Sequence, residues 1–361
     1  MQRTTLSEKS SKARLKNSTK AFTMSFEDQR QAKRLRGVLL KCGGFSSQLA
    51  NNVSEKVDGD PLWGSRFDWT HPSAVVQTHL DFLLCGADII LSNTYQSSVD
   101  GFIKYLGLTR EQSIDLMAKS VHLAQQAREL YMEQLAPGCG HLEPGLPLVL
   151  ASIGPYGAHL HDGSEYSGGY ADKVTKEQLQ KWHSTRIDTC LKQAGADGLA
   201  VETIPCQIEA EAVTDLILRE HKGVKFWVSF QCKDEVSLAH GESFAQAALS
   251  IWRIVQSHNA QSCLLGIGVN CVNPSFVSPL FISLNAAAGE ERIPLIVYSN
   301  RGETYDSDKG EWIAGEDLKP LVDYVPEWCS LGACIIGGCC RVYPADILQM
   351  RQCIDNIGNN N

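Results

Sequence analysis

Three cysteines carry the clearest chemical signal in this chain. Cys271 follows one apolar run, and Cys339 and Cys340 follow another that ends in two glycines. Three thiolates suit Zn²⁺, which is soft enough to prefer sulfur, and they leave the fourth position of a tetrahedral ion open for a substrate. A vicinal cysteine pair alone is also compatible with buried packing or with a redox-sensitive pair. The metal hypothesis therefore depends on whether the fold brings Cys271 to the pair.

The two glycines before the pair, Gly337 and Gly338, bear on how both thiols point. Residues without a Cβ atom permit backbone conformations that other residues avoid. We expect the chain to turn sharply here, so that the adjacent thiols face one ion and not the two opposite faces of a strand.

Eight short apolar runs, separated by segments with helical patterns, repeat along the chain in the rhythm of βα units. Each run is mostly apolar on both faces, as in strands of a buried parallel sheet. The runs span residues 37–40, 87–91, 148–153, 198–201, 226–230, 264–269, 295–298 and 333–336, and the helical segments span residues 73–84, 110–135, 176–194, 208–221, 243–258 and 274–288. Eight repeats predict an α/β fold, a single (β/α)8 TIM barrel over residues 36–352. An open doubly wound sheet is the alternative, but no Gly-x-Gly-x-x-Gly follows the first run.

The segments on either side of the barrel are predicted to be tails. Residues 1–35 form a basic segment that we expect to be disordered, and residues 353–361 are expected to form a C-terminal tail. The first 26 residues, rich in Ser, Thr, Lys and Arg, are also compatible with a weak organelle-targeting peptide.

Composition restricts the partners and the location. The formal net charge of −8 argues against a nucleic-acid groove or an anionic membrane as the main partner, so we expect small-molecule substrates. No apolar stretch approaches the length of a membrane span, and no secretory signal opens the chain, which predicts a cytoplasmic protein. Thirteen cysteines without an export signal indicate reduced thiols and not a disulfide framework.

The barrel hypothesis places the three cysteines together. Catalytic groups in this fold lie at the C-terminal ends of the strands. Cys271 ends the sixth predicted strand, and Cys339 and Cys340 end the eighth. The three thiols are therefore expected to converge at one rim of the barrel, where they would bind one zinc ion per chain.

Ordered blocks of sequence over about residues 36–352 resemble the homocysteine S-methyltransferase family. The blocks are Gly43-Gly44-Phe45 with Gln48-Leu49, Asp60-Pro61-Leu62-Trp63, Asn93-Thr94-Tyr95-Gln96, Gly154-Pro155-Tyr156-Gly157, Asp162-Gly163-Ser164-Glu165-Tyr166, Glu202-Thr203-Ile204-Pro205, Gly268-Val269-Asn270-Cys271, Tyr298-Ser299-Asn300 with Gly302-Glu303, and Gly337-Gly338-Cys339-Cys340-Arg341. The resemblance implies a barrel with a three-cysteine zinc site that activates homocysteine.

The chemistry fits the residues independently of the resemblance. A free thiol, with a pKa of about 8.5, is mostly protonated near neutral pH, and only its thiolate is a good nucleophile. A zinc ion would hold the homocysteine sulfur deprotonated for attack on the methyl group of a sulfonium donor, yielding methionine. The block from Asp162 to Tyr166 looks more like the branch that uses S-methylmethionine, with S-adenosylmethionine as a poorer donor. Another donor or acceptor, such as betaine or selenocysteine, and a catalytically impaired zinc-binding barrel are the alternatives.

Candidate substrate-binding residues come from the resemblance, which implies a role for Glu202, and from side-chain chemistry. Glu202 would bind the ammonium group of homocysteine, or alternatively cap a helix or pair with an arginine. Trp63, Tyr95, Tyr156 and Tyr166 would surround the methyl group of the cationic donor, although single aromatic residues are more often part of a core. Asp162, with Glu165, would bind the amino group of the donor or shape a surface turn. Asn300, within a matching block, completes the candidates.

One residue departs from the family's pattern. The family usually has Asp before the Gly-Gly that ends the first strand, where it is thought to help bind the amino-acid substrate, but this chain has Cys42. In a closed barrel the first and eighth strands are neighbours, so Cys42 is expected near Cys339 and Cys340. Either Glu202 acts alone on the substrate, or Cys42 becomes a fourth thiolate ligand and closes the metal site.

Overall fold

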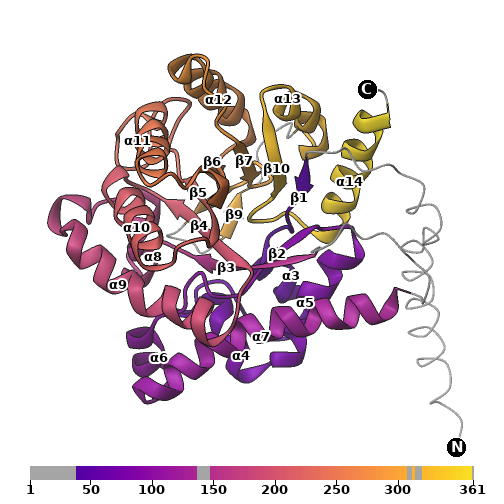
Figure 1. The fold of residues 1–361 in the computed structure, drawn as a ribbon. Coiled ribbons are helices and arrows are strands. Elements are labelled where there is room, and N and C mark those ends of the chain that lie inside the picture. The colour runs from indigo at the N-terminus through magenta and orange to yellow at the C-terminus, as the bar shows by residue number, and fades with distance from the viewer. Residues whose placement is uncertain (1–37, 136–146, 307–310, 314–318, 360–361) are drawn as a thin grey trace, which may run out of the picture.

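Eight parallel strands lie at the centre of the molecule with helices around them (Figure 1). The computed structural model describes residues 38–135, 147–306, 311–313 and 319–359, so the predicted N-terminal tail lies outside the described residues. The strands are β1 Leu39–Leu40, β2 Ile89–Leu91, β3 Leu148–Ile153, β4 Gly198–Ile204, β5 Lys225–Phe230, β6 Leu264–Asn270, β7 Leu295–Ser299 and β10 Ala333–Gly338.

The order of these strands makes the sheet a nearly closed barrel. Neighbours run β1-β10-β7-β6-β5-β4-β3-β2, and a bridge between Lys41 and Ile89 brings the end of β1 to β2. The predicted (β/α)8 barrel is therefore confirmed. The short antiparallel pair β8 Thr304–Asp306 and β9 Glu311–Ile313 lies between β7 and β10 in the chain.

Helices connect the strands and cover the outside of the barrel, as βα repeats require. Two of them begin at a Thr-x-x-Gln capping box, in which Thr109 or Thr175 accepts from the backbone of the glutamine three residues later. The helices are α3 Phe45–Asn52, α4 Phe67–Thr70, α5 Pro72–Leu84, α6 Val99–Leu106, α7 Arg110–Gln134, α8 Tyr156–Leu160, α9 Lys176–Asp188, α10 Gln207–Glu220, α11 Phe244–Ser257, α12 Pro274–Ala288, α13 Val325–Ser330 and α14 Pro344–Asn359.

The structure changes the predicted C-terminal boundary. The sequence interpretation ended the barrel at residue 352 and assigned residues 353–361 to a tail, but α14 continues to Asn359. Ile354 is fully buried, so an apolar side chain of the supposed tail belongs to the core. Arg351 in this helix donates to the buried Asp88 carboxylate at 2.9 Å, and Asp88 also accepts from the Leu40 amide. The last helix therefore stabilises the seam between β1 and β2.

Two further features bear on the chemistry. Among the described helices none is both long and apolar enough to cross a membrane. The twelve cysteines that the structure describes are free thiols, as the reduced-thiol prediction expects.

Candidate metal centre and substrate cavity

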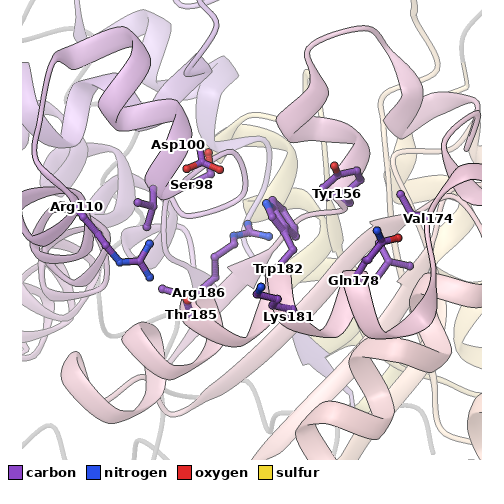
Figure 2. Close-up of a pocket in the computed structure, with 12 residues that line it drawn as sticks. Ser98, Asp100, Arg110, Tyr156, Val174, Gln178, Lys181, Trp182, Thr185 and Arg186 are labelled. Atoms are coloured by element: carbon purple, nitrogen blue, oxygen red, sulfur yellow. The ribbon is translucent and has the colours of Figure 1, made fainter.

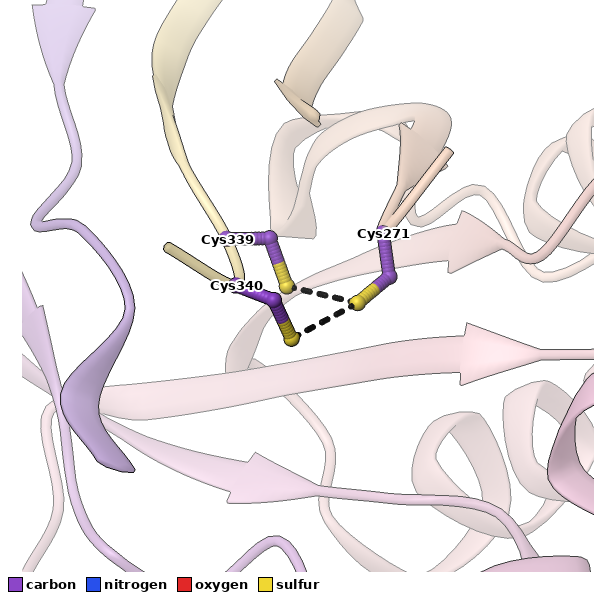
Figure 3. Close-up of side chains that lie close together, drawn as sticks. All are labelled: Cys271, Cys339 and Cys340. Carbon is purple, nitrogen blue, oxygen red and sulfur yellow. Dashed lines mark hydrogen bonds between the residues drawn. The ribbon is translucent and has the colours of Figure 1, made fainter. Parts of the chain in front are cut away.

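The thiols of Cys271, Cys339 and Cys340 converge at the C-terminal rim of the barrel (Figure 3). Cys271 directly follows β6, and the adjacent pair directly follows β10. The Cys271 Sγ atom lies 3.0 Å from the Cys339 Sγ atom and 3.4 Å from the Cys340 Sγ atom. Sulfurs bound to tetrahedral zinc at about 2.3 Å lie about 3.8 Å apart, so small side-chain adjustments suffice. This donor set fits a zinc ion.

The backbone turns sharply at Cys271 itself. Its φ is +55°, in the left-handed region that residues other than glycine rarely adopt. Thr203, near the end of β4, and Arg341, three residues after β10, also have positive φ values, of 59° and 65°. Unfavourable backbone conformations of this kind gather at functional sites, where the surrounding structure maintains them. The orientation of the Cys271 thiol toward β10 thus depends on a strained residue.

The glycines before the cysteine pair have a different role from the predicted one. Gly337 and Gly338 are the last residues of β10, and neither has a positive φ. Instead, neighbouring chain segments approach too closely to leave room for side chains. A Cβ atom at Gly337 would lie 2.6 Å from the Lys41 carbonyl oxygen, and one at Gly338 would lie 2.2 Å from the Val342 side chain. The prediction of a sharp turn here was wrong, because close packing and not a turn requires these glycines.

The three thiols differ in their pKa values. Hydrogen bonding from Cys271 and Cys340 holds the pKa of Cys339 well below its usual range, while the interaction with Cys339 raises the pKa of Cys271. The Asn270 side-chain amide lies 4.0 Å from Cys339 Sγ and is itself fixed by Thr203 and Ser229. One thiolate is therefore favoured before any ion arrives, and a metal would displace the remaining protons.

Cys42 is buried near this cluster but does not belong to it. Among the described His, Cys, Asp and Glu side chains, the group whose ligand atoms lie within 4.8 Å of one another consists of Cys271, Cys339 and Cys340. Burial raises the pKa of the Cys42 thiol. This geometry favours an open fourth position over closure by a fourth cysteine.

Lys41, which the sequence interpretation missed, is a buried cation beside the cysteines. Only 4% of the residue is exposed, its Nζ atom donates to the carbonyl oxygens of Gly43 at 3.3 Å and Gly338 at 2.9 Å, and it lies 4.6 Å from the centre of the Tyr298 ring. Burial alone would lower the pKa of Lys41, but the negative charges of Cys42 and Glu202 outweigh it and raise that pKa. The only sequence signal was a charged residue at the end of an apolar strand.

Glu202 lies inside the rim, within β4. A break in the pairing between β4 and β5 separates Val201 from Ile204, so Glu202 and Thr203 occupy an irregular stretch of strand. Ser152 donates a hydrogen bond to the Glu202 carboxylate. Burial raises the pKa of Glu202 to about 7, although the Lys41 charge opposes this. The carboxylate is thus available near neutral pH without a permanent ion pair.

One cavity of about 130 Å³ contains most of the candidate residues. The three cysteines, Cys42 and Glu202 line it together with Trp63, Tyr95 and Tyr166. The candidate Glu165 lines it as well, and so do Lys41, Ser152 and Thr203, for which the sequence predicted no role. Acidic, cationic, thiol and aromatic groups therefore face the same small space.

Three candidates do not line this cavity. Asp162 is exposed, and its carboxylate accepts from the Ser164 amide at 3.0 Å in a tight turn. Asn300 accepts from the Gly302 amide at 3.0 Å and likewise shapes a turn. Tyr156 lines a different cavity. In this structure Asp162 shapes a surface turn, whereas Glu165 and Tyr166 of the same loop line the substrate cavity.

The cavity that Tyr156 lines, of about 440 Å³, is lined mainly by residues of α6, α7, α8 and α9, among them Asp100, Arg110 and Trp182 (Figure 2). Arg186 forms part of its wall beside Trp182, with the guanidinium 4.6 Å from the indole ring. This buried guanidinium donates to the Thr94, Tyr95 and Gly154 carbonyl oxygens at 3.1, 2.9 and 2.8 Å. Arg186 therefore fixes the backbone that presents Tyr95 to the substrate cavity.

Comparisons with known proteins agree with this arrangement. A family model described as homocysteine S-methyltransferase matches residues 39–354. A betaine-homocysteine S-methyltransferase of Drosophila melanogaster is 62% identical over 321 residues, covering 89% of this chain and 95% of the relative. Homocysteine S-methyltransferase 2 of Zea mays is 36% identical and covers 90% and 91%.

The same family appears among solved structures. The metallated form of the homocysteine methyltransferase MmuM from Escherichia coli superposes with a TM-score of 0.72 at 32% sequence identity. The match covers 88% of this chain and 96% of that structure. The barrel, the cysteine cluster and the sequence similarity agree with one another over nearly the whole described chain. The protein therefore belongs to the homocysteine S-methyltransferase family and is a methyltransferase.

Proposed function

We propose that this protein binds one zinc ion through Cys271, Cys339 and Cys340 and transfers a methyl group from a sulfonium donor to homocysteine, forming methionine. The observation that carries the proposal is the convergence of three thiols within a cavity that also contains an acidic residue and several aromatic residues. The metallated form of MmuM is consistent with a metal in this fold.

The bound zinc would supply Lewis acidity, keeping the homocysteine sulfur as a thiolate at neutral pH. Glu202 has the charge and position to bind the substrate's ammonium group, which orients the sulfur toward the cysteines. Trp63, Tyr95 and Tyr166 would face the donor, whose positive charge is attracted to aromatic faces by about 0.5 to 2 kcal/mol per contact. In the transfer, the sulfur forms a bond to the methyl carbon as the donor's carbon–sulfur bond breaks. The donor leaves as a neutral thioether.

S-Methylmethionine is our first candidate donor, with S-adenosylmethionine as a poorer one. Aromatic walls attract a sulfonium and a quaternary ammonium alike, so they do not separate S-methylmethionine from betaine. Betaine is the second candidate because the Drosophila relative at 62% identity is named for it. The exposed Asp162 offers no contact within the cavity, which removes one reason for preferring a donor with an amino group.

A donor panel with purified, zinc-loaded protein tests the proposal. Homocysteine is supplied with S-methylmethionine, S-adenosylmethionine or betaine, and products are measured by NMR. S-Methylmethionine should give two methionines per turnover, whereas betaine would give one methionine and one dimethylglycine. Turnover with betaine alone would replace our first candidate by the second. Absence of turnover with every donor, in protein that retains zinc, would reject the proposed function.

A further inference from the structure

The buried Lys41 ammonium has no carboxylate partner. Among the described residues, no Asp or Glu oxygen forms an ion pair with it, and it donates to two carbonyl oxygens. Placing a charge in a protein interior is costly unless an opposite charge compensates for it. The carbonyl dipoles, the Tyr298 ring and the charges of neighbouring groups, Glu202 among them, offset this cost without a direct ion pair. The ammonium therefore has no carboxylate bound directly to it and can accept one from a ligand.

Cys42 explains why the charge remains available. An aspartate at that position, as in the resembling sequences, would place a carboxylate on the residue next to Lys41. The thiol of Cys42 is a weak hydrogen-bond acceptor, and burial raises its pKa, which favours the neutral form. A buried thiol with a raised pKa therefore competes for the Lys41 charge less strongly than an aspartate carboxylate would.

Lys41 and Glu202 line the same cavity and carry opposite charges. Glu202 is buried and accepts a hydrogen bond from Ser152, but it forms no ion pair with Lys41. The cavity volume, about 130 Å³, suits a small amino acid. An α-amino acid carries an ammonium and a carboxylate on one carbon, so a wall with one anion and one cation complements both groups.

We propose that Lys41 binds the α-carboxylate of the thiol acceptor while Glu202 binds its ammonium group, making Lys41 a specificity-determining residue for a zwitterionic thiol. This inference rests on the proposed function for the identity of the acceptor. It goes further by assigning the carboxylate-binding residue and by giving position 42 a role. The bound carboxylate would accept a charge-assisted hydrogen bond from the Lys41 ammonium.

Binding of three thiols tests the assignment without any methyl transfer. Homocysteine is compared with 3-aminopropane-1-thiol, which lacks the carboxylate, and with 4-mercaptobutanoate, which lacks the amino group. Dissociation constants are measured by titration calorimetry on zinc-loaded protein without donor, for wild type, Lys41→Met, Lys41→Arg and Glu202→Gln. Zinc content and thermal unfolding are recorded for each variant.

In wild type, loss of the carboxylate should weaken binding about 30-fold, the effect of one charge-assisted hydrogen bond. In Lys41→Met this preference should fall to about threefold or less, while the preference for the amino group persists. Lys41→Arg should recover part of the carboxylate preference, because it keeps the charge. Glu202→Gln should show the opposite pattern, losing the preference for the amino group only.

An unchanged carboxylate preference in Lys41→Met that retains zinc would overturn the assignment. Loss of zinc from Lys41→Met would leave Lys41→Arg as the deciding variant. If Lys41→Arg retained zinc but bound the carboxylate-free thiol as well as homocysteine, the assignment would also be rejected. Failure of the proposed function would give a different result, because the wild-type protein would then bind no homocysteine or would bind it without turnover.

Discussion

Cys42 decides whether a metal ion at the proposed site would have three or four protein sulfurs. Its thiol lies outside the cluster formed by Cys271, Cys339 and Cys340, so zinc should have three protein sulfurs and an open position. We predict that Cys42→Ser retains zinc, whereas Cys339→Ser loses most of it. X-ray absorption at the zinc edge should give three sulfur neighbours in both wild type and Cys42→Ser, rising to four when homocysteine is added. Four sulfurs in wild type before homocysteine is added would mean that Cys42 closes the site.

Glu202 gives a second test at the level of a single residue. Burial raises the pKa of its carboxyl group to about 7, so the group is neutral well below that pH and anionic well above it. Affinity for the homocysteine ammonium should therefore increase as pH rises through about 7. Loss of the thiol proton on binding acts in the same direction, but it is common to wild type and Glu202→Gln.

The ratio of the homocysteine dissociation constants of Glu202→Gln and wild type therefore reports the contribution of the Glu202 carboxylate alone. We expect Glu202→Gln to bind homocysteine about as well as wild type near pH 5.5 and about tenfold more weakly near pH 8, as measured by calorimetry. A ratio that does not change between these two pH values would contradict the assigned role of Glu202.

At the level of elements, the end of β10 has no room for added atoms. A Cβ atom at Gly338 would overlap the Val342 side chain at 2.2 Å, so Gly338→Ala must displace the segment that carries Cys339 and Cys340. We predict that it lowers the free energy of unfolding by about 1 to 3 kcal/mol and weakens zinc retention. Chemical denaturation and zinc analysis measure the two effects.

Gly169 provides the matched control for this substitution. It has no positive φ, and the nearest atom to an added Cβ is the Ser167 Oγ at 3.5 Å, an ordinary contact. Gly169→Ala should therefore change neither stability nor zinc content appreciably. Equal effects of the two substitutions would show that crowding beside the cysteines is not what matters.

Some features of the strands could be predicted from the sequence, and others could not. The run at 148–153 coincides with β3, because a strand that is apolar on both faces leaves a local pattern. The position of Lys41 inside the barrel leaves no such pattern, since only the pairing of β1 with β10 makes that position interior. The packing role of Gly337 was missed for the same reason, because the atoms that exclude a side chain belong to Lys41, nearly three hundred residues earlier.

Likewise, the convergence of the cysteines was predictable from strand ends, whereas the placement of loop residues was not. Cys271 directly follows its strand, so the barrel geometry alone determines its approximate location. Asp162 lies eight residues beyond Gly154, within a loop whose turn directs its carboxylate to the Ser164 amide. No periodic pattern indicates which loop side chains face the cavity.

For the whole molecule, α14 connects the last repeat to the first. Arg351 is 7% exposed and donates to the Asp88 carboxylate, which is 1% exposed. Replacing one member of a buried ion pair leaves a charge uncompensated, at a cost of about 3 to 5 kcal/mol. We predict that Arg351→Met lowers the free energy of unfolding by this amount, as measured by urea denaturation.

The double variant Asp88→Asn with Arg351→Met separates this charge effect from lost packing. It should recover part of the lost stability, because the Asp88 charge is removed together with its arginine partner, while the ion pair of Arg351 with Asp355 at 2.7 Å is lost in both variants. A double variant that is no more stable than Arg351→Met would indicate that packing of the arginine side chain dominates.

The pairing of β1 with β10 also bears on when the protein can acquire its metal during synthesis. Leu39 of β1 pairs with Ile335 of β10. Since β10 is the last strand of the barrel in the sequence, β1 can form this pairing only after the other strands have been synthesised. Cys339 and Cys340 emerge from the ribosome after Cys271 and after the charged cavity residues Lys41 and Glu202. The three-cysteine site can therefore be complete only after nearly all of the barrel sequence has been synthesised. A nascent chain arrested before β10 would have Lys41 and Glu202 but no complete thiol cluster to capture the ion.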